Sequence, residues 1–159
     1  MILSGKGTSV DILFSAIKND NEKTKKLMKK ILLVDDEKAF RDATKKLLEG
    51  AGYTVDTAID GLDAETYLDS KEYDVIITDI VMPRKEGIQF IRECKERNIQ
   101  SKIIAISGGG RASANEYLTM AKAFKADATI SKPYSFSDLI NTLQRVSATA
   151  SGPSGWDKS

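Results

Sequence analysis

Five short apolar runs recur along this chain, and a stretch with helical character follows each of them. The runs cover residues 31–34, 53–58, 75–78, 103–106 and 128–131. Each pair is separated by enough chain for the right-handed helical crossover that joins parallel strands. The runs at 31–34 and 75–78 are almost entirely apolar, as in strands covered on both faces, whereas 53–58 alternates and suits an edge strand. The pattern predicts an α/β fold with one parallel sheet.

The helical stretches also carry apolar sides. Residues 37–48 read as a helix whose apolar side comprises Phe40, Ala43, Leu47 and Leu48. Strands that alternate with helices in this way predict a flavodoxin-like, doubly wound (βα)5 domain with the strand order 2-1-3-4-5.

Polar residues stand directly after four of the five runs. They are Asp35 and Asp36, Asp79, Ser107 and Lys132. In a doubly wound sheet, ligands bind beyond the carboxyl ends of the strands, at the point where the strand order reverses. Strands one and three are neighbours in the order 2-1-3-4-5, and strands four and five lie next along the sheet. The five side chains therefore form one candidate site.

The residue types in this site suit a metal ion and a phosphoryl group. Three carboxylates brought together repel one another, and a hard divalent cation such as Mg²⁺ removes that cost. Asp36 and Asp79 are candidates for direct metal ligands, the backbone carbonyl of Val81 for a third, and Asp35 for a ligand through water. Lys132 is then a cation beside an anionic cluster.

The same residues define a nucleophile. An aspartate forms an acyl phosphate when its oxygen is aimed at a phosphoryl group whose charge is neutralised by a metal and a lysine. Asp79 is the candidate, because it ends the central strand. Ser107 supplies a hydrogen-bond donor for a phosphoryl oxygen, and the adjacent Gly108 is expected to leave space for that donor to approach.

Composition excludes several other classes of protein. The 159 residues include 24 basic and 23 acidic ones, so a net charge of +1 predicts no direct binding to nucleic acid or to an anionic membrane. Cys94 is the only cysteine and there is no histidine, which excludes an intrachain disulfide and the usual zinc sites. The apolar runs are too short to span a membrane, and the start of the chain lacks signal-peptide character, so a cytoplasmic location is expected.

The chain divides into three parts. Residues 1–28 form a basic N-terminal extension that is expected to be partly helical, 29–148 form the domain, and 149–159 form a flexible tail rich in Ser and Gly. The tail is too short for a DNA-binding domain, so direct control of transcription is not expected unless the chain is a fragment of a larger regulator.

Four stretches together resemble the receiver domain of two-component response regulators, of the CheY-like, apparently stand-alone kind. They are Ile31–Glu37, Asp74–Pro83 with Gly87 beyond it, Ile106–Gly108, and Ser131–Tyr134. Each stretch is unspecific alone, but their order and spacing across residues 29–148 are specific as a set.

This resemblance implies a role for each site residue. Asp79 would accept a phosphoryl group from a histidine kinase or a histidine phosphotransfer protein, with Mg²⁺ held by Asp36, Asp79 and the Val81 carbonyl and assisted by Asp35. Ser107 and Lys132 would bind the phosphoryl group, and the Lys132–Pro133 peptide would be cis. Such a protein is not a conventional enzyme, because it catalyses only its own phosphorylation and dephosphorylation. It would act on an unknown downstream protein or pass on the phosphoryl group, as a monomer or as a phosphorylation-dependent dimer.

One position departs from the family pattern. Receivers commonly carry an aromatic residue three positions before the lysine, which couples the hydroxyl residue to the outer surface, and here that position is Thr129. The switch from Ser107 through Thr129 is therefore unusual, and a phosphate-independent interaction module is the alternative function. A phosphohydrolase is disfavoured, because its family has a second aspartate two residues after the nucleophile and this chain has Val81.

Overall fold

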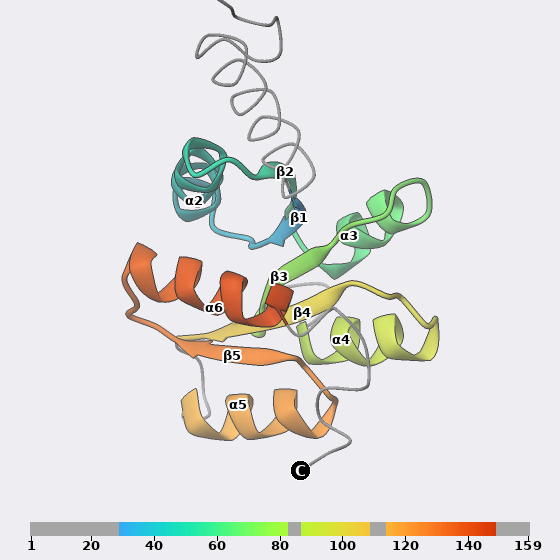
Figure 1. Cartoon of the computed structure of the whole chain (residues 1–159). Helices are drawn as coiled ribbons and strands as arrows, with labels where there is room; N and C mark the ends of the chain where they lie inside the picture. Colours follow the sequence, from blue (N-terminus) through green and yellow to red (C-terminus); the bar gives the residue numbers. More distant parts are fainter. Residues whose placement is uncertain (1–28, 83–86, 109–113, 149–159) are drawn as a thin grey trace, which may run out of the picture.

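A five-stranded, all-parallel sheet with helices on both faces forms the described part of the protein (Figure 1). This computed structural model describes residues 29–82, 87–108 and 114–148. The strand order is β2-β1-β3-β4-β5, which confirms the expected doubly wound architecture. The strands are β1 (Lys30–Val34), β2 (Thr54–Ala58), β3 (Val75–Asp79), β4 (Lys102–Ser107) and β5 (Ala128–Ser131). Each agrees with its predicted run to within one residue at either end.

The helices divide between the two faces of the sheet. They are α2 (Lys38–Gly50), α3 (Gly61–Leu68), α4 (Gly87–Glu96), α5 (Ala114–Ala123) and α6 (Phe136–Ala148). Buried residues of α2 and α6 pack on one face, and those of α3, α4 and α5 pack on the other. None of the helices in the described ranges is long and apolar enough to cross a bilayer. The proposed extension 1–28, the tail 149–159 and Pro83 lie outside the described residues.

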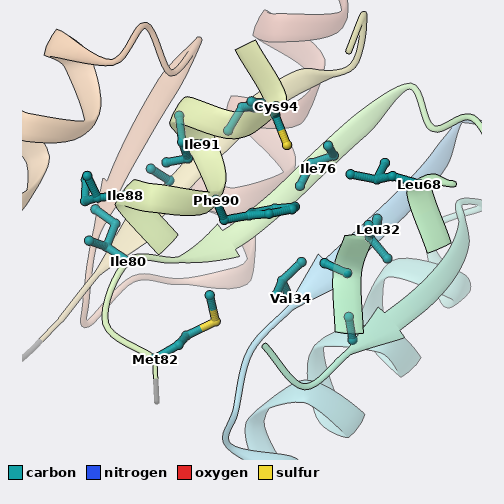
Figure 2. Packing of buried hydrophobic residues seen from close by; sticks show 14 of the residues in the cluster. Leu32, Val34, Leu68, Ile76, Ile80, Met82, Ile88, Phe90, Ile91 and Cys94 are labelled. Atoms are coloured by element: carbon teal, nitrogen blue, oxygen red, sulfur yellow. The ribbon is translucent and has the colours of Figure 1, made fainter. Parts of the chain in front are cut away.

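Strand β1 shows why the central runs are continuously apolar. Ile31 and Leu33 pack against the face with α2 and α6, whereas Leu32 and Val34 pack against the opposite face. Successive side chains on a strand point to opposite faces, so a strand covered on both sides needs an apolar residue at every position. Figure 2 shows the buried residues on that opposite face, which include Leu32 and Val34. The fully buried ring of Phe90 points from α4 toward the sheet there.

Helix α2 buries only part of the side that was expected. Thr44 and Leu48 are its buried residues, whereas Ala43 is exposed and Leu47 is 50% exposed. The predicted apolar side was therefore wrong at Ala43 and Leu47. Helix α2 packs on β2, and Thr44 rather than Leu47 is buried with Leu48.

Gly87 allows α4 to start against the end of β3. A Cβ at this position would lie 2.0 Å from the backbone oxygen of Asp79 and 2.7 Å from the Cα of Ile80. The Gly87 amide also donates to the Ile80 carbonyl, at 2.8 Å. Backbone atoms cannot rotate away as a side chain does, so any larger residue must push α4 away from the sheet.

We expect Gly87→Ala to lower the free energy of unfolding by about 1–3 kcal/mol, because the added methyl group overpacks a backbone contact. Urea denaturation of the two proteins measures this difference. Gly50→Ala is the control: nothing lies within 4 Å of a Cβ there, and alanine in a helix is favoured over glycine. Equal effects of the two substitutions would contradict the close-approach explanation.

Candidate functional site

Three carboxylates meet at the carboxyl end of β1 and β3. These strands are neighbours, with Val34 paired to Thr78, so Asp35 and Asp79 emerge side by side. Asp36 follows directly. One oxygen from each of the three aspartates lies within 4.8 Å of the others. Asp35 is 2% and Asp79 8% exposed, whereas Asp36 faces solvent.

The start of α2 holds Asp35 in place. Its Oδ1 accepts a hydrogen bond from the Glu37 amide at 2.8 Å, and its carbonyl oxygen accepts one from Arg41 Nη1 at 2.8 Å. The first bond satisfies a backbone N–H at the helix N-terminus, as a capping side chain does. Asp35 thus contributes both to the start of α2 and to the acid cluster.

Burial raises the pKa of Asp35 to about 6, and the charges of Asp79 and Asp36 add to the effect, although the Glu37 amide and Lys132 oppose it. The folded protein then binds this proton more tightly than the unfolded chain does. Without metal, the contribution of Asp35 to stability is therefore complete below its ordinary pKa of 3.8 and is lost as the pH rises to about 6.

We expect this titration to cost about 3 kcal/mol of stability in chelator-treated protein, since each pKa unit is worth about 1.4 kcal/mol. Asp35→Asn keeps the acceptor for Glu37 and removes the titration, so its stability should vary less across that pH range. Urea denaturation at several pH values, with a chelator present, measures both proteins. Identical pH slopes would show that Asp35 is not the titrating group.

Lys132 reaches the carboxylates from the end of β5. Its Nζ lies 3.1 Å from Asp79 Oδ2, to which it donates, and 3.8 Å from Asp35 Oδ2. Burial disfavours its charge, but the carboxylates of Asp79 and Asp35 outweigh burial and raise the pKa of Lys132. The lysine is therefore a fixed cation. Its peptide bond to Pro133 is cis, as expected.

Ser107 ends β4 beside Lys132. Its carbonyl accepts from the Lys132 amide at 2.7 Å. The side chain is fully buried, and Oγ has no hydrogen-bond partner among the residues that the structure describes. A buried hydroxyl is normally hydrogen-bonded. The Ser107 hydroxyl is therefore free to donate a hydrogen bond to an oxygen of a bound ligand.

Gly108 has a different role from the expected one. A Cβ there would lie 2.1, 2.5 and 2.6 Å from three carbons of the Lys132 side chain. The space that the glycine leaves is therefore filled by the stem of Lys132, not by an approaching donor. The lysine reaches Asp79 because it runs over bare backbone.

Two aromatic residues complete the site and were missed as functional residues in the sequence. The Phe40 ring centroid lies 4.6 Å from Lys132 Nζ. Tyr134 packs its ring against Phe40 at a centroid distance of 6.0 Å and an angle of 88°. Phe40 comes four residues after Asp36, in the first turn of α2, and this spacing was the available signal. Thr129 is half-buried in β5, where it pairs with Ala105.

The carboxylates suit a small divalent cation. Within the described part of the chain, Lys132 is the only cation that forms ion pairs with these three acids. One ammonium group does not balance three carboxylates, and an all-oxygen ligand set is what Mg²⁺ prefers. One oxygen of each carboxylate lies within 4.8 Å of the others, so the three groups are close enough to share one such ion, directly or through water.

The site and sheet together define a class of signalling module. The chain belongs to the response regulator receiver domain family, whose model matches residues 31–144. It is 33% identical over 119 residues to the response regulator receiver protein CpdR of Brucella abortus, covering 75% of this chain and 97% of that protein. It is 30% identical over 112 residues to the transcriptional regulatory protein DltR of Streptococcus agalactiae, covering 65% of this chain.

The chain spans only about half of DltR, 49% of its length. Among solved structures, the chemotaxis response regulator CheY4 of Vibrio cholerae is similar, with a TM-score of 0.67 and 32% identity over 75% of this chain and 98% of that one. A CheY-like receiver domain protein from Methanospirillum hungatei has a TM-score of 0.71 and 27% identity, covering 77% of this chain and 96% of that one. These similarities confirm the family that the sequence motifs indicated.

Proposed function

We propose that this chain is a phosphorylation-activated signalling receiver in which Asp79 accepts the phosphoryl group. The observation that carries the proposal is the position of the Asp79 carboxylate. It is almost buried, it lies within 4.8 Å of two other carboxylates, and it accepts from Lys132 at 3.1 Å. Family membership supports the same assignment.

The reaction is a displacement at phosphorus. An Asp79 carboxylate oxygen attacks, an acyl phosphate P–O bond forms, and the bond from phosphorus to the donor's imidazole nitrogen breaks. The imidazole carries a proton on its other ring nitrogen, so it takes the electrons of the broken bond and leaves as a neutral ring. The Val81 amide, which donates to Asp79 Oδ1 at 3.0 Å, orients the carboxylate for this attack. Lys132 and the buried Ser107 hydroxyl then bind phosphoryl oxygens.

Asp36, Asp79 and the Val81 carbonyl are the proposed ligands of Mg²⁺, with Asp35 acting through water. The ion, when bound, neutralises charge on the transferred phosphoryl group. Asp35 would be held deprotonated by that charge, which is opposite to the effect of burial on its pKa in the free site. Metal binding is therefore expected to be weaker at acidic pH.

The proposed partners follow from the same reaction. A histidine kinase or a histidine phosphotransfer protein donates the phosphoryl group, because this chain has no histidine of its own. The output is binding to a downstream protein or onward phosphotransfer, in the cytoplasm. We assign residues 29–148 to the receiver domain, flanked by the extension 1–28 and the tail 149–159. Thr129 favours a second candidate, a module that binds its partner without phosphorylation.

Incubation with acetyl phosphate, followed by intact-mass measurement, tests the proposal. We expect one phosphoryl adduct on the wild-type chain when MgCl₂ is present, and none with a chelator in its place. An unmodified protein under both conditions would refute phosphorylation and favour the phosphate-independent module.

A further inference from the structure

Lys132 is enclosed on two sides by groups that carry no charge. The bare backbone of Gly108 lies against its stem, and the Phe40 ring lies 4.6 Å from Nζ. Of the described residues, only Asp79 and Asp35 form ion pairs with this ammonium group. A lysine has four rotatable side-chain bonds, so these two uncharged walls limit where its ammonium group can go.

Phe40 is itself held by Tyr134. Tyr134 packs against Phe40 at 88°, the edge-to-face arrangement that aromatic pairs favour. Both residues are half-buried; Phe40 lies on α2, and Tyr134 follows β5. The Tyr134 hydroxyl is buried without a hydrogen-bond partner among the described residues. Its ring, not its hydroxyl, therefore makes the contact with Phe40.

We propose that Phe40, supported by the Tyr134 ring, is a positioning residue that holds the Lys132 ammonium group toward Asp79 for phosphoryl transfer. The ring face attracts the cation without competing for its hydrogen bonds, so the N–H groups stay available to Asp79 and to the phosphoryl oxygens. The inference rests on the proposed function for the role of Lys132, and it assigns the aromatic pair a role in that reaction.

The first test compares phosphorylation rates from acetyl phosphate and MgCl₂. Phe40→Leu keeps most of the apolar volume but removes the ring, and we expect it to slow the reaction about threefold to tenfold, the range of one partly desolvated cation–π contact. Phe40→Tyr restores a ring and should react near the wild-type rate. Tyr134→Phe keeps the supporting ring and should do the same. Leu47→Ala, at an exposed position of the same helix, is the matched control.

Wild-type speed in Phe40→Leu would overturn the proposal, and so would equal slowing by Phe40→Leu and Phe40→Tyr. Slowing by Tyr134→Phe would also overturn it, because the hydroxyl and not the ring would then be the active part. Thermal unfolding of each variant separates these effects from loss of the fold.

A second measurement does not depend on phosphorylation. In NMR spectra of the wild-type protein, ring currents should shift the ε-methylene protons of Lys132 upfield of those of the other lysines, and Phe40→Leu should abolish the shift. If this shift is present but acetyl phosphate gives no adduct, the proposed function fails while the aromatic–lysine contact stands. An unshifted Lys132 signal in the wild type would overturn the positioning role itself.

Discussion

Asp79→Asn is expected to abolish phosphorylation by acetyl phosphate. The amide of asparagine cannot attack phosphorus as a carboxylate oxygen does. The neighbouring Asp35 is not expected to replace Asp79 as the acceptor, because its carboxylate lies 3.8 Å from Lys132 Nζ, against 3.1 Å for Asp79. Intact-mass spectrometry after incubation with acetyl phosphate and MgCl₂ should show the adduct on the wild type and none on the variant.

Asp74→Asn provides the matched control. Asp74 precedes β3, whereas Asp79 ends it, so the two aspartates stand at opposite ends of one strand. The Asp74 carboxylate accepts from the Lys30 amide at 2.8 Å, far from the acid cluster along the sheet. This variant should be phosphorylated like the wild type. An adduct that survives in Asp79→Asn would mean that another residue is the acceptor.

Lys132→Met should slow phosphorylation about 100-fold or more, the usual effect of removing one fixed donor from a developing oxyanion. Methionine retains a flexible, unbranched stem that fits over Gly108, so the change removes mainly the charge and its hydrogen bonds. The rate of adduct formation at fixed acetyl phosphate and MgCl₂ concentrations measures the effect.

Lys102→Met controls for the loss of a partly buried lysine. The Lys102 side chain is 28% exposed, close to the 24% of Lys132, and its Nζ lies 3.8 Å from Asp127 Oδ1. It stands at the opposite end of the sheet, at the start of β4. We expect an unchanged rate for this variant. If both methionine variants react at the wild-type rate, Lys132 has no part in the transfer.

The sheet was predictable because its evidence is local and redundant. A strand covered on both sides needs apolar side chains on both faces, so a run such as Ile31–Val34 can be identified from the local sequence alone. The strand boundaries followed from the polar residues that end those runs. The side of α2 that faces the sheet was harder, because Leu47 and Thr44 lie on adjoining parts of the helix surface and a modest rotation exchanges them.

The members of the candidate site were predictable for a related reason. Parallel strands bring their carboxyl ends to one edge, so Asp35, Asp79 and Lys132 had to be near one another once the strand order was known. The aromatic pair was not predictable in this way. Phe40 reads as an ordinary apolar helix position, and its ring meets the ammonium group only because α2 packs on β1 and β2 while the Lys132 side chain reaches across from the end of β5.

The sequence by itself determined the parallel α/β architecture and the acids, hydroxyl and lysine at its carboxyl edge, because periodicity and strand ends are properties of short segments. The tertiary structure alone decided how those groups are held. The stem of Lys132 lies against the bare backbone of Gly108, its ammonium group lies over the Phe40 ring, and that ring packs against Tyr134. Such contacts join segments far apart in the chain, and their geometry depends on how each helix is rotated against the sheet.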